Sequence, residues 1–326
     1  MLLADFVKEG ISTLESLYPT KEARNIALIL CEELLGTKSY RLSVITVNYN
    51  GLHDTCALLD HLAFNPADTE VIVVDNGSAN NEADVITSRY PDVRCIRSEK
   101  NLGFAGGNNL GIKHAVGKYL FFVNNDTEVN MEDIDKLVMR MESMEHIGIM
   151  CPKIRFYYGE QHIQYAGFTP MSRITCRNRG IGYDEPDNGQ CDTPGPTAFA
   201  HGAAMLVRKE TIDKVGLMPE CYFLYYEEMD WSMMMKRNGY QIWYEPSATI
   251  YHKESQSTGA NSPLKTYYLT RNRLLFIKRN SEQFRLLSYI YLICIVGAID
   301  IIKNTLCGKI KIAQATINGI IDFIKN

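Results

Sequence analysis

The chain of 326 residues is 46% hydrophobic and 22% charged, which is typical of a globular protein with a large core and excludes a mainly disordered chain. Its net charge of −4 is unevenly spread: residues 261–326 hold ten Lys and Arg against three Asp and Glu, which leaves about −11 on residues 1–260. An acidic body with a basic, apolar tail argues against nucleic acid as a partner and favours a tail on an anionic membrane surface.

The nine cysteines are scattered and show no C-x-x-C pairs, which indicates free thiols in a reducing compartment. The N-terminal sequence MLLADFVKEG has early acidic residues and no long apolar run, so it does not resemble a secretory signal. We therefore expect a cytoplasmic protein, one that can lie peripherally at the inner face of the cell membrane.

Residues 1–40 carry apolar side chains at helical spacing, namely Ala23, Ile26, Ala27, Leu30 and Leu34 before Gly36. This stretch contains no cluster of chemically active side chains. We predict a helical N-terminal appendage that serves packing or dimerisation.

The pattern changes at Leu42, where LSVITVNYN predicts a strand, followed by a helix over Cys56–Leu62. Three more buried strands are predicted at EVIVVDNGS, VRCIRSE and KYLFFVNND, with a helix at GNNLGIKHAV before the last. Strands that alternate with helices indicate an α/β fold with a Rossmann-like, mostly parallel sheet flanked by helices.

Polar clusters follow three of these strands, at Asn48-Tyr49-Asn50, Asp75-Asn76-Gly77 and Asn124-Asn125-Asp126. In open α/β sheets, ligands bind beyond the carboxyl ends of the strands. We therefore predict one composite site at this edge of the sheet.

Asp75 and Asp126 are candidate acidic residues of that site. A hard divalent cation that bridges phosphates needs only one or two protein carboxylates, because phosphate and water oxygens complete its shell. Taken alone, each residue also fits a simple turn or a helix cap.

Three carboxylates, Glu227, Glu228 and Asp230, lie within four residues. Such crowding raises the pKa of its members and is costly unless a metal, a cation or a catalytic role offsets it. The alternative is a solvated acidic turn. His252 follows the strand-like ATIY and fits either a metal ligand or a structural histidine.

Helices are predicted after Pro263. Tyr289–Ile299 is uninterruptedly apolar but only eleven residues long, whereas about 20 are needed to cross a bilayer, and Asp300 ends the run. Apolar residues then recur at helical spacing from Ile310 to Ile324. We predict two interfacial helices; helices packed on the body or on a partner are the alternative. The predicted domains are residues 1–40, 41–262 and 263–326.

Eight motifs occur in order within the region Leu42 to Arg279: TVNYNG, VVDNGS, KNLGFAGGNNLGI, FFVNNDTEV, HGAAMLVRKE, FLYYEEMDW, GYQIWYEPSATIYH and HKESQSTG. Together they resemble the family 2 glycosyltransferases, particularly the rhamnosyltransferase-like branch of the GT-A fold. The resemblance implies a nucleotide-sugar transferase with that fold.

The resemblance implies a donor-binding set in which Asp75 recognises the nucleotide base. Further donor contacts are implied for Thr46, Asn48, Asn50, Asn101, Gly103, Phe104, Asn108 and Asn125. The D-x-D element of the family corresponds to Asn124-Asn125-Asp126, in which only the last residue is acidic. Asp126 and His252 are therefore the implied ligands of a divalent metal, Mg²⁺ or Mn²⁺.

The acidic segment is implied to be catalytic, with Glu228 as the general base. Asp230 would support Glu228 or bind the acceptor, and Glu227 belongs to the same cluster. Two departures occur: the family commonly has Asp at the position of Glu228, and Arg at the position of Met234.

The expected reaction is an inverting single displacement that moves a sugar from dTDP-rhamnose or a UDP-sugar to a glycan or lipid-linked acceptor in cell-surface polysaccharide synthesis. The incomplete D-x-D leaves one alternative open: a catalytically weak nucleotide-sugar-binding or scaffolding subunit of a polysaccharide assembly complex. A nucleotidyltransferase of similar sheet topology would need a glycine-rich phosphate-binding loop near the first strand. The chain instead reads TVNYNGLHD there, which argues against that class.

Overall fold

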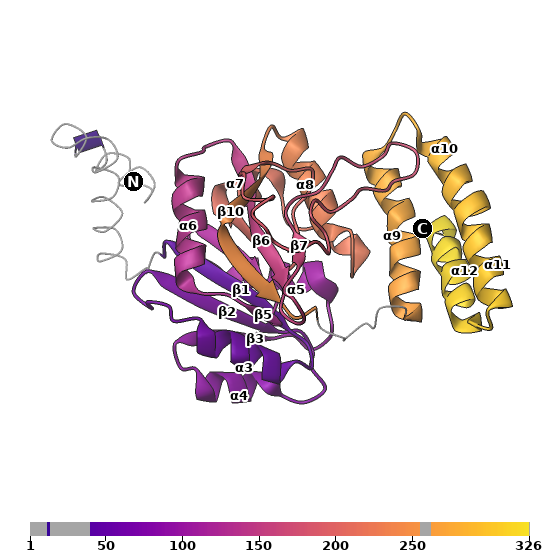
Figure 1. The fold of residues 1–326 in the computed structure, drawn as a ribbon. Coiled ribbons are helices and arrows are strands. Elements are labelled where there is room, and N and C mark those ends of the chain that lie inside the picture. The colour runs from indigo at the N-terminus through magenta and orange to yellow at the C-terminus, as the bar shows by residue number, and fades with distance from the viewer. Residues whose placement is uncertain (1–11, 14–39, 255–261, 326) are drawn as a thin grey trace.

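A computed structural model describes residues 12–13, 40–254 and 262–325 of the chain (Figure 1). The predicted N-terminal appendage lies almost entirely outside the described residues. Most of the motif HKESQSTG also lies outside them, since residues 255–261 are not described.

The four predicted strands are confirmed and pair in parallel in the order β3-β2-β1-β4. Their bounds are Leu42–Asn48 for β1, Thr69–Asp75 for β2, Val93–Arg97 for β3 and Tyr119–Val123 for β4. Most residues of β1, β2 and β4 are buried, as expected for strands covered by helices on both faces.

The sheet continues beyond β4 in the order β9-β6-β10-β5. The bounds are Ala204–Arg208 (β9), Ile147–Phe156 (β6), Gln241–His252 (β10) and Thr127–Glu128 (β5), with Ile163–Tyr165 (β7) on β6 and Gly195–Pro196 (β8) on β10. β9 runs antiparallel between β4 and β6, and β10 is parallel to β6. The predicted mostly parallel sheet is therefore confirmed, with antiparallel additions.

Helices cover both faces of the sheet (Figure 1). One face carries α3 (Leu52–His61), α4 (Glu82–Arg89) and α6 (Met131–Glu142), and the other carries α5 (Gly103–His114), α7 (Lys209–Val215) and α8 (Glu227–Arg237). On the second face, α5 packs closely on β1, since a Cβ at Gly111 would contact Ile45. Trp231 of α8 packs edge-on against Phe122 of β4, which is the neighbour of Ile45 in the sheet, so α8 covers the same face. The helices expected over residues 56–62 and 107–116 correspond to α3 and α5.

Helices form the C-terminal part: α9 (Pro263–Asn280), α10 (Arg285–Tyr289), the π-helical η2 (Ile290–Gly297), α11 (Ala298–Leu306) and α12 (Ile310–Lys325). Ser262 caps the N-terminus of α9, because its hydroxyl accepts a hydrogen bond from the amide of Lys265 (3.1 Å). α12 packs so closely on α9 that a Cβ at Gly319 would lie only 2.9 Å from the carbonyl oxygen of Tyr267.

The prediction that the apolar run is too short to cross a membrane is wrong, because the helix that contains this run is longer than the run itself. α10, η2 and α11 form one helix, Arg285–Leu306, of 22 residues, long and apolar enough by length and composition to cross a bilayer. Asp300 lies inside this helix, because a single charged residue does not end a helix.

Candidate active site

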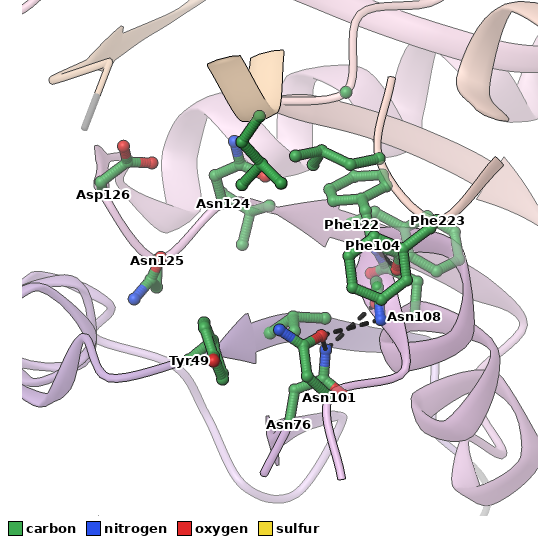
Figure 2. A pocket seen from close by; sticks show the side chains of 16 residues that line it. Tyr49, Asn76, Asn101, Phe104, Asn108, Phe122, Asn124, Asn125, Asp126 and Phe223 are labelled. Carbon is green, nitrogen blue, oxygen red and sulfur yellow. Dashed lines mark hydrogen bonds between the residues drawn. The ribbon is translucent and has the colours of Figure 1, made fainter. Parts of the chain in front are cut away.

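A cavity of about 280 Å³ lies beyond the carboxyl ends of β1, β2 and β4 (Figure 2). Each of the three predicted polar clusters contributes to its wall, through Tyr49, Asn76 and the Asn124–Asp126 segment. The strand ends therefore meet at one site, as the parallel topology requires.

The predicted donor-site residues divide into two groups. Asn101, Gly103, Asn108 and Asn125 line the cavity together with Phe104 and the predicted metal ligand Asp126. Thr46, Asn48 and Asp75 are fully buried and do not line it, and Asn50 is exposed beside them.

Asp75 ends β2 with its side chain enclosed by protein. Its Oδ1 accepts the amide of Ser78 (3.2 Å), and Arg97 Nη1 lies 3.7 Å from its Oδ2. Oδ2 accepts no hydrogen bond from the described residues. A buried acceptor without a donor is costly, so the Oδ2 atom carries hydrogen-bonding capacity that the described residues do not use.

Asn48 links the ends of β1 and β2 to the helices below them. Its amide nitrogen donates to Glu82 Oε2 (2.7 Å) and lies 3.5 Å from Asp75 Oδ1, while its Oδ1 accepts from Thr55 Oγ1 (2.7 Å). Asn48 therefore fixes the surroundings of Asp75.

Asn76, which the sequence did not single out for a role, supports the glycine-rich segment. Its Nδ2 donates to the carbonyl of Gly103 (3.1 Å) and to Asn101 Oδ1 (3.2 Å), and its Oδ1 accepts the amide of Leu102 (3.0 Å). Figure 2 shows Asn76 and Asn101 side by side at the base of the cavity.

Gly103 makes the close approach of two chain segments possible. Its φ is +76°, and a Cβ there would lie 2.2 Å from the carbonyl oxygen of Phe223. The same carbonyl accepts the amide of Phe104 (2.8 Å), so the start of α5 and the turn before α8 are joined at the cavity.

Asp126 and His252 come from distant parts of the sequence and meet at the sheet edge where β5 pairs with β10. His252 Nε2 lies 3.1 Å from Asp126 Oδ1, and both side chains are buried. Gln164 Oε1 lies 2.8 Å from His252 Nδ1. When Nδ1–H donates to Gln164, Nε2 is the ring nitrogen that can bind a metal.

A neutral imidazole nitrogen and a carboxylate oxygen that face each other can both bind one cation. Ligand distances of about 2.0–2.1 Å at right angles place adjacent ligands of one octahedral ion about 3 Å apart, close to the spacing of this pair. No group of three or more His, Cys, Asp or Glu suited to a metal occurs within residues 40–254 and 262–325. A two-ligand site still suits a cation completed by phosphate and water.

The cavity wall is poor in charge. Asp126 is the one charged side chain among its described lining residues, which are otherwise amides, glycines and apolar groups. A diphosphate here would face a carboxylate, with no lysine or arginine among the described lining residues. A bound cation would offset that repulsion.

The turn before α8 is strained. Phe223, Tyr225 and Tyr226 have φ values of 69°, 69° and 80°, in a region that costs non-glycine residues about 1–3 kcal/mol each. Asn272 of α9 holds the turn with its fully buried amide, which donates to the carbonyls of Leu224 (2.7 Å) and Tyr225 (2.9 Å). Strain of this kind is typical of functional sites.

Glu228 lies in the first turn of α8, directly after the strained residues. A Cβ on Gly202, which lines the cavity, would be 3.9 Å from the Glu228 carboxyl carbon and 3.5 Å from the Phe104 ring. The carboxyl group therefore lies next to Gly202, close to the cavity, although Glu228 is not itself one of the described lining residues. Burial raises the pKa of Glu228 to about 7.

The other two acidic residues of the segment differ from Glu228. Burial, with the neighbouring Glu228 charge, raises the pKa of Glu227 well above its usual value. Asp230 faces α9, where Arg279 and Asn280 Nδ2 (2.7 Å) contact its two oxygens; the hydroxyl of Tyr222, just before the strained turn, also donates to it (3.1 Å). These contacts anchor α8 to α9; the catalytic roles predicted for Glu227 and Asp230 stay predictions.

Gln164 and Asn272 are further polar residues at the site that sequence reasoning missed. Both are single amides outside any recognisable cluster, and each becomes meaningful only through its partner, His252 or the strained turn. The run TRNRLLF around Asn272 gave only a helical signal.

Comparison with known proteins agrees with this geometry. The sequence profile of glycosyl transferase family 2 matches residues 43–216. The low-salt glycan biosynthesis hexosyltransferase Agl10 of Haloferax volcanii is 26% identical over 293 residues, 87% of this chain and 91% of the relative. An N-acetylglucosaminyl-diphospho-decaprenol L-rhamnosyltransferase of Mycobacterium tuberculosis is 24% identical over 67% of this chain and 78% of its own. The mannosyltransferase PcManGT of Pyrobaculum calidifontis, solved with GDP-Man and Mn²⁺, aligns over 88% of each chain with a TM-score of 0.53 and 12% identity, which confirms the predicted GT-A fold.

Proposed function

The chain belongs to glycosyltransferase family 2, and from this we propose that it moves one sugar from a nucleotide-diphosphate donor to an acceptor hydroxyl with inversion at the anomeric carbon. The observation that carries the proposal is the Asp126–His252 pair at the rim of a cavity with no cationic side chain among its described lining residues. Such a wall suits a donor that arrives with its own divalent cation.

Asp126 and His252 would hold Mg²⁺ or Mn²⁺, as the Mn²⁺ complex of the Pyrobaculum mannosyltransferase also suggests. When bound, the cation neutralises the charge that develops on the departing nucleoside diphosphate. Gln164 fixes the orientation of His252, and its loss would weaken the metal site without removing a ligand.

The base of the donor is proposed to bind at Asp75. Uracil and thymine both carry an imide N–H, which could donate to Oδ2 of this buried carboxylate, an atom that accepts no hydrogen bond from the described residues. A UDP-sugar or dTDP-rhamnose is therefore the proposed donor, and the name of the mycobacterial relative favours rhamnose as the sugar.

Glu228 is the proposed general base. Its carboxylate accepts the proton of the acceptor hydroxyl while the hydroxyl oxygen attacks the anomeric carbon from the face opposite the diphosphate. The strained turn holds this side chain beside the donor cavity, and a pKa of about 7 matches a base that works at neutral pH.

The acceptor is proposed to be a glycan or lipid-linked saccharide at the inner face of a membrane. The helix Arg285–Leu306 exposes large aliphatic side chains, among them Leu286 (71% exposed) and Leu306 (83% exposed). The chain from the start of this helix to the end of α12 also carries basic residues, namely Arg285, Lys303, Lys309, Lys311 and Lys325. An apolar face with nearby cations suits an anionic lipid surface.

The donor proposal is tested by thermal unfolding with a panel of nucleotide-sugars, each with and without Mn²⁺. A donor at 100 times its Kd adds about 2.7 kcal/mol of stability, so one uridine or thymidine nucleotide-sugar should raise the melting temperature only with the metal. Asp126→Ala should abolish this rise, and His252→Ala should weaken it less. Stabilisation that EDTA leaves intact would refute the metal site.

A further inference from the structure

A second cavity, of about 670 Å³, lies between α8, α9 and the loop of residues 168–176, and shares no described lining residue with the donor site. Its volume is in the range of small-molecule sites. The wall is largely apolar, with side chains of Met171, Ile181, Phe199, Met233 and Phe276. The proposed donor chemistry uses none of these residues.

The charge of this cavity is of one sign. Lys236 and Arg173 line it, and none of its described lining residues is Asp or Glu. No carboxylate oxygen of the described residues lies within 4.0 Å of either cation; Lys236 donates to the carbonyl of Ala198 and lies over the Phe199 ring (5.2 Å). Both side chains are exposed to solvent, so their positive charge can be reached by an anionic ligand from the surface.

The cavity connects the membrane-facing helix to the catalytic helix. The Ser288 hydroxyl of α10 donates to the carbonyl of Arg173 (3.1 Å), so the cavity wall is attached beside the exposed Leu286 and Leu287. At the other end, Lys236 lies eight residues after Glu228 on α8, or about 12 Å along the axis. One sugar ring with a diphosphate spans a distance of that order.

We propose that this cavity binds the diphosphate and the first apolar units of a lipid-linked acceptor. Lys236 and Arg173 contact the diphosphate, the apolar wall contacts the lipid chain, and the attached sugar extends along α8 toward Glu228. The inference rests on the proposed transfer to a lipid-linked acceptor and adds where the lipid end binds.

The experiment is isothermal titration of the full-length protein with farnesyl diphosphate, inorganic pyrophosphate and farnesol, all in EDTA so that the metal site cannot bind phosphate. Farnesyl diphosphate should bind at least tenfold more tightly than pyrophosphate or farnesol, because only it engages both the cations and the apolar wall. Lys236→Met and Arg173→Gln should each weaken its binding about tenfold or more.

Lys118→Met is the matched control, since this lysine is exposed, lies over the Tyr119 ring and is remote in sequence from the cavity; it should bind as the wild type does. Arg173→Gln covers the case in which Lys236→Met unfolds, because it removes no side-chain hydrogen bond of the described structure. Equal binding by both variants and the wild type, or farnesol binding as tight as that of farnesyl diphosphate, would overturn the assignment.

Donor binding, followed separately by thermal shift with Mn²⁺, distinguishes the two proposals. If the protein binds a nucleotide-sugar, but binds pyrophosphate and farnesol as tightly as farnesyl diphosphate, the lipid site is refuted and the donor proposal stands. A protein that binds farnesyl diphosphate through Lys236 and Arg173 but binds no nucleotide-sugar would support the site and contradict the proposed transferase donor.

Discussion

Replacing Glu228 by Gln removes the proposed proton acceptor and keeps the size of the side chain. General base catalysis typically contributes about 10²–10⁴-fold, so kcat should fall by that order while the donor still binds. The wild-type rate should rise with pH through about 7 and level off above it, because only the ionised carboxylate accepts a proton. The low rate of the variant should lack this step.

The same substitution has a calculable effect on stability. The Glu228 pKa rises from 4.5 to about 7 on folding, so between these values the folded protein retains a proton that the unfolded chain has released. Stability therefore falls as pH rises from about 4.5 to about 7, by at most about 3 kcal/mol at 1.36 kcal/mol per pKa unit. Glu228→Gln should be more stable than the wild type at pH 8 and gain nothing near pH 4.5.

The assays are urea unfolding at the two pH values and a pH–rate profile, with Glu145→Gln, an exposed glutamate between α6 and β6, as the control. Transfer by Glu228→Gln at close to the wild-type rate would refute the assignment and move the role to Glu227 or Asp230. A wild-type rate profile with its midpoint near 4.5 would refute the burial argument.

Three further predictions follow from the geometry. Asp75→Asn should weaken binding of UDP or dTDP by about 10- to 100-fold in isothermal titration, because the buried acceptor for the base N–H is lost, and unchanged affinity would place the base elsewhere. Asn272→Ala should lower kcat about 10- to 100-fold with a smaller effect on donor affinity, because the strained turn loses the hydrogen bonds from the Asn272 amide. An unchanged kcat would show that the turn keeps its conformation without these hydrogen bonds. Ile299→Glu with Ile302→Glu should abolish co-sedimentation with anionic liposomes, whereas Val116→Glu, a similarly exposed position on the body, should not; equal binding by all would exclude this helix face from membrane contact.

The sequence was sufficient to predict the first half of the fold, because β1, β2 and β4 are continuous apolar runs that end in polar residues. It was also sufficient for the meeting of their ends at one cavity, since parallel strands place their carboxyl ends at the same edge. The antiparallel insertion of β9 between β4 and β6 could not be predicted, because strand order depends on contacts between segments distant in the chain.

The candidate site was predictable where chemistry is clustered and not where it depends on single contacts. Asp126 and His252 came from motifs, but their 3.1 Å approach depends on the pairing of β5 with β10. The contacts of Asp230 with α9 were not foreseen, because its partners Arg279 and Asn280 are 50 residues away and look like an ordinary basic helix end.

The central claim, metal-dependent sugar transfer from a nucleotide-diphosphate donor, is tested most directly by mass spectrometry of the acceptor. Full-length protein is incubated with Mn²⁺, a lipid-linked saccharide acceptor and the nucleotide-sugar that stabilises it best. The account predicts an acceptor heavier by one sugar residue and an equal amount of released nucleoside diphosphate, both lost in EDTA and in Asp126→Ala. Donor that binds but leaves the acceptor mass unchanged across the donor and acceptor panels, or transfer that persists in EDTA, would contradict it.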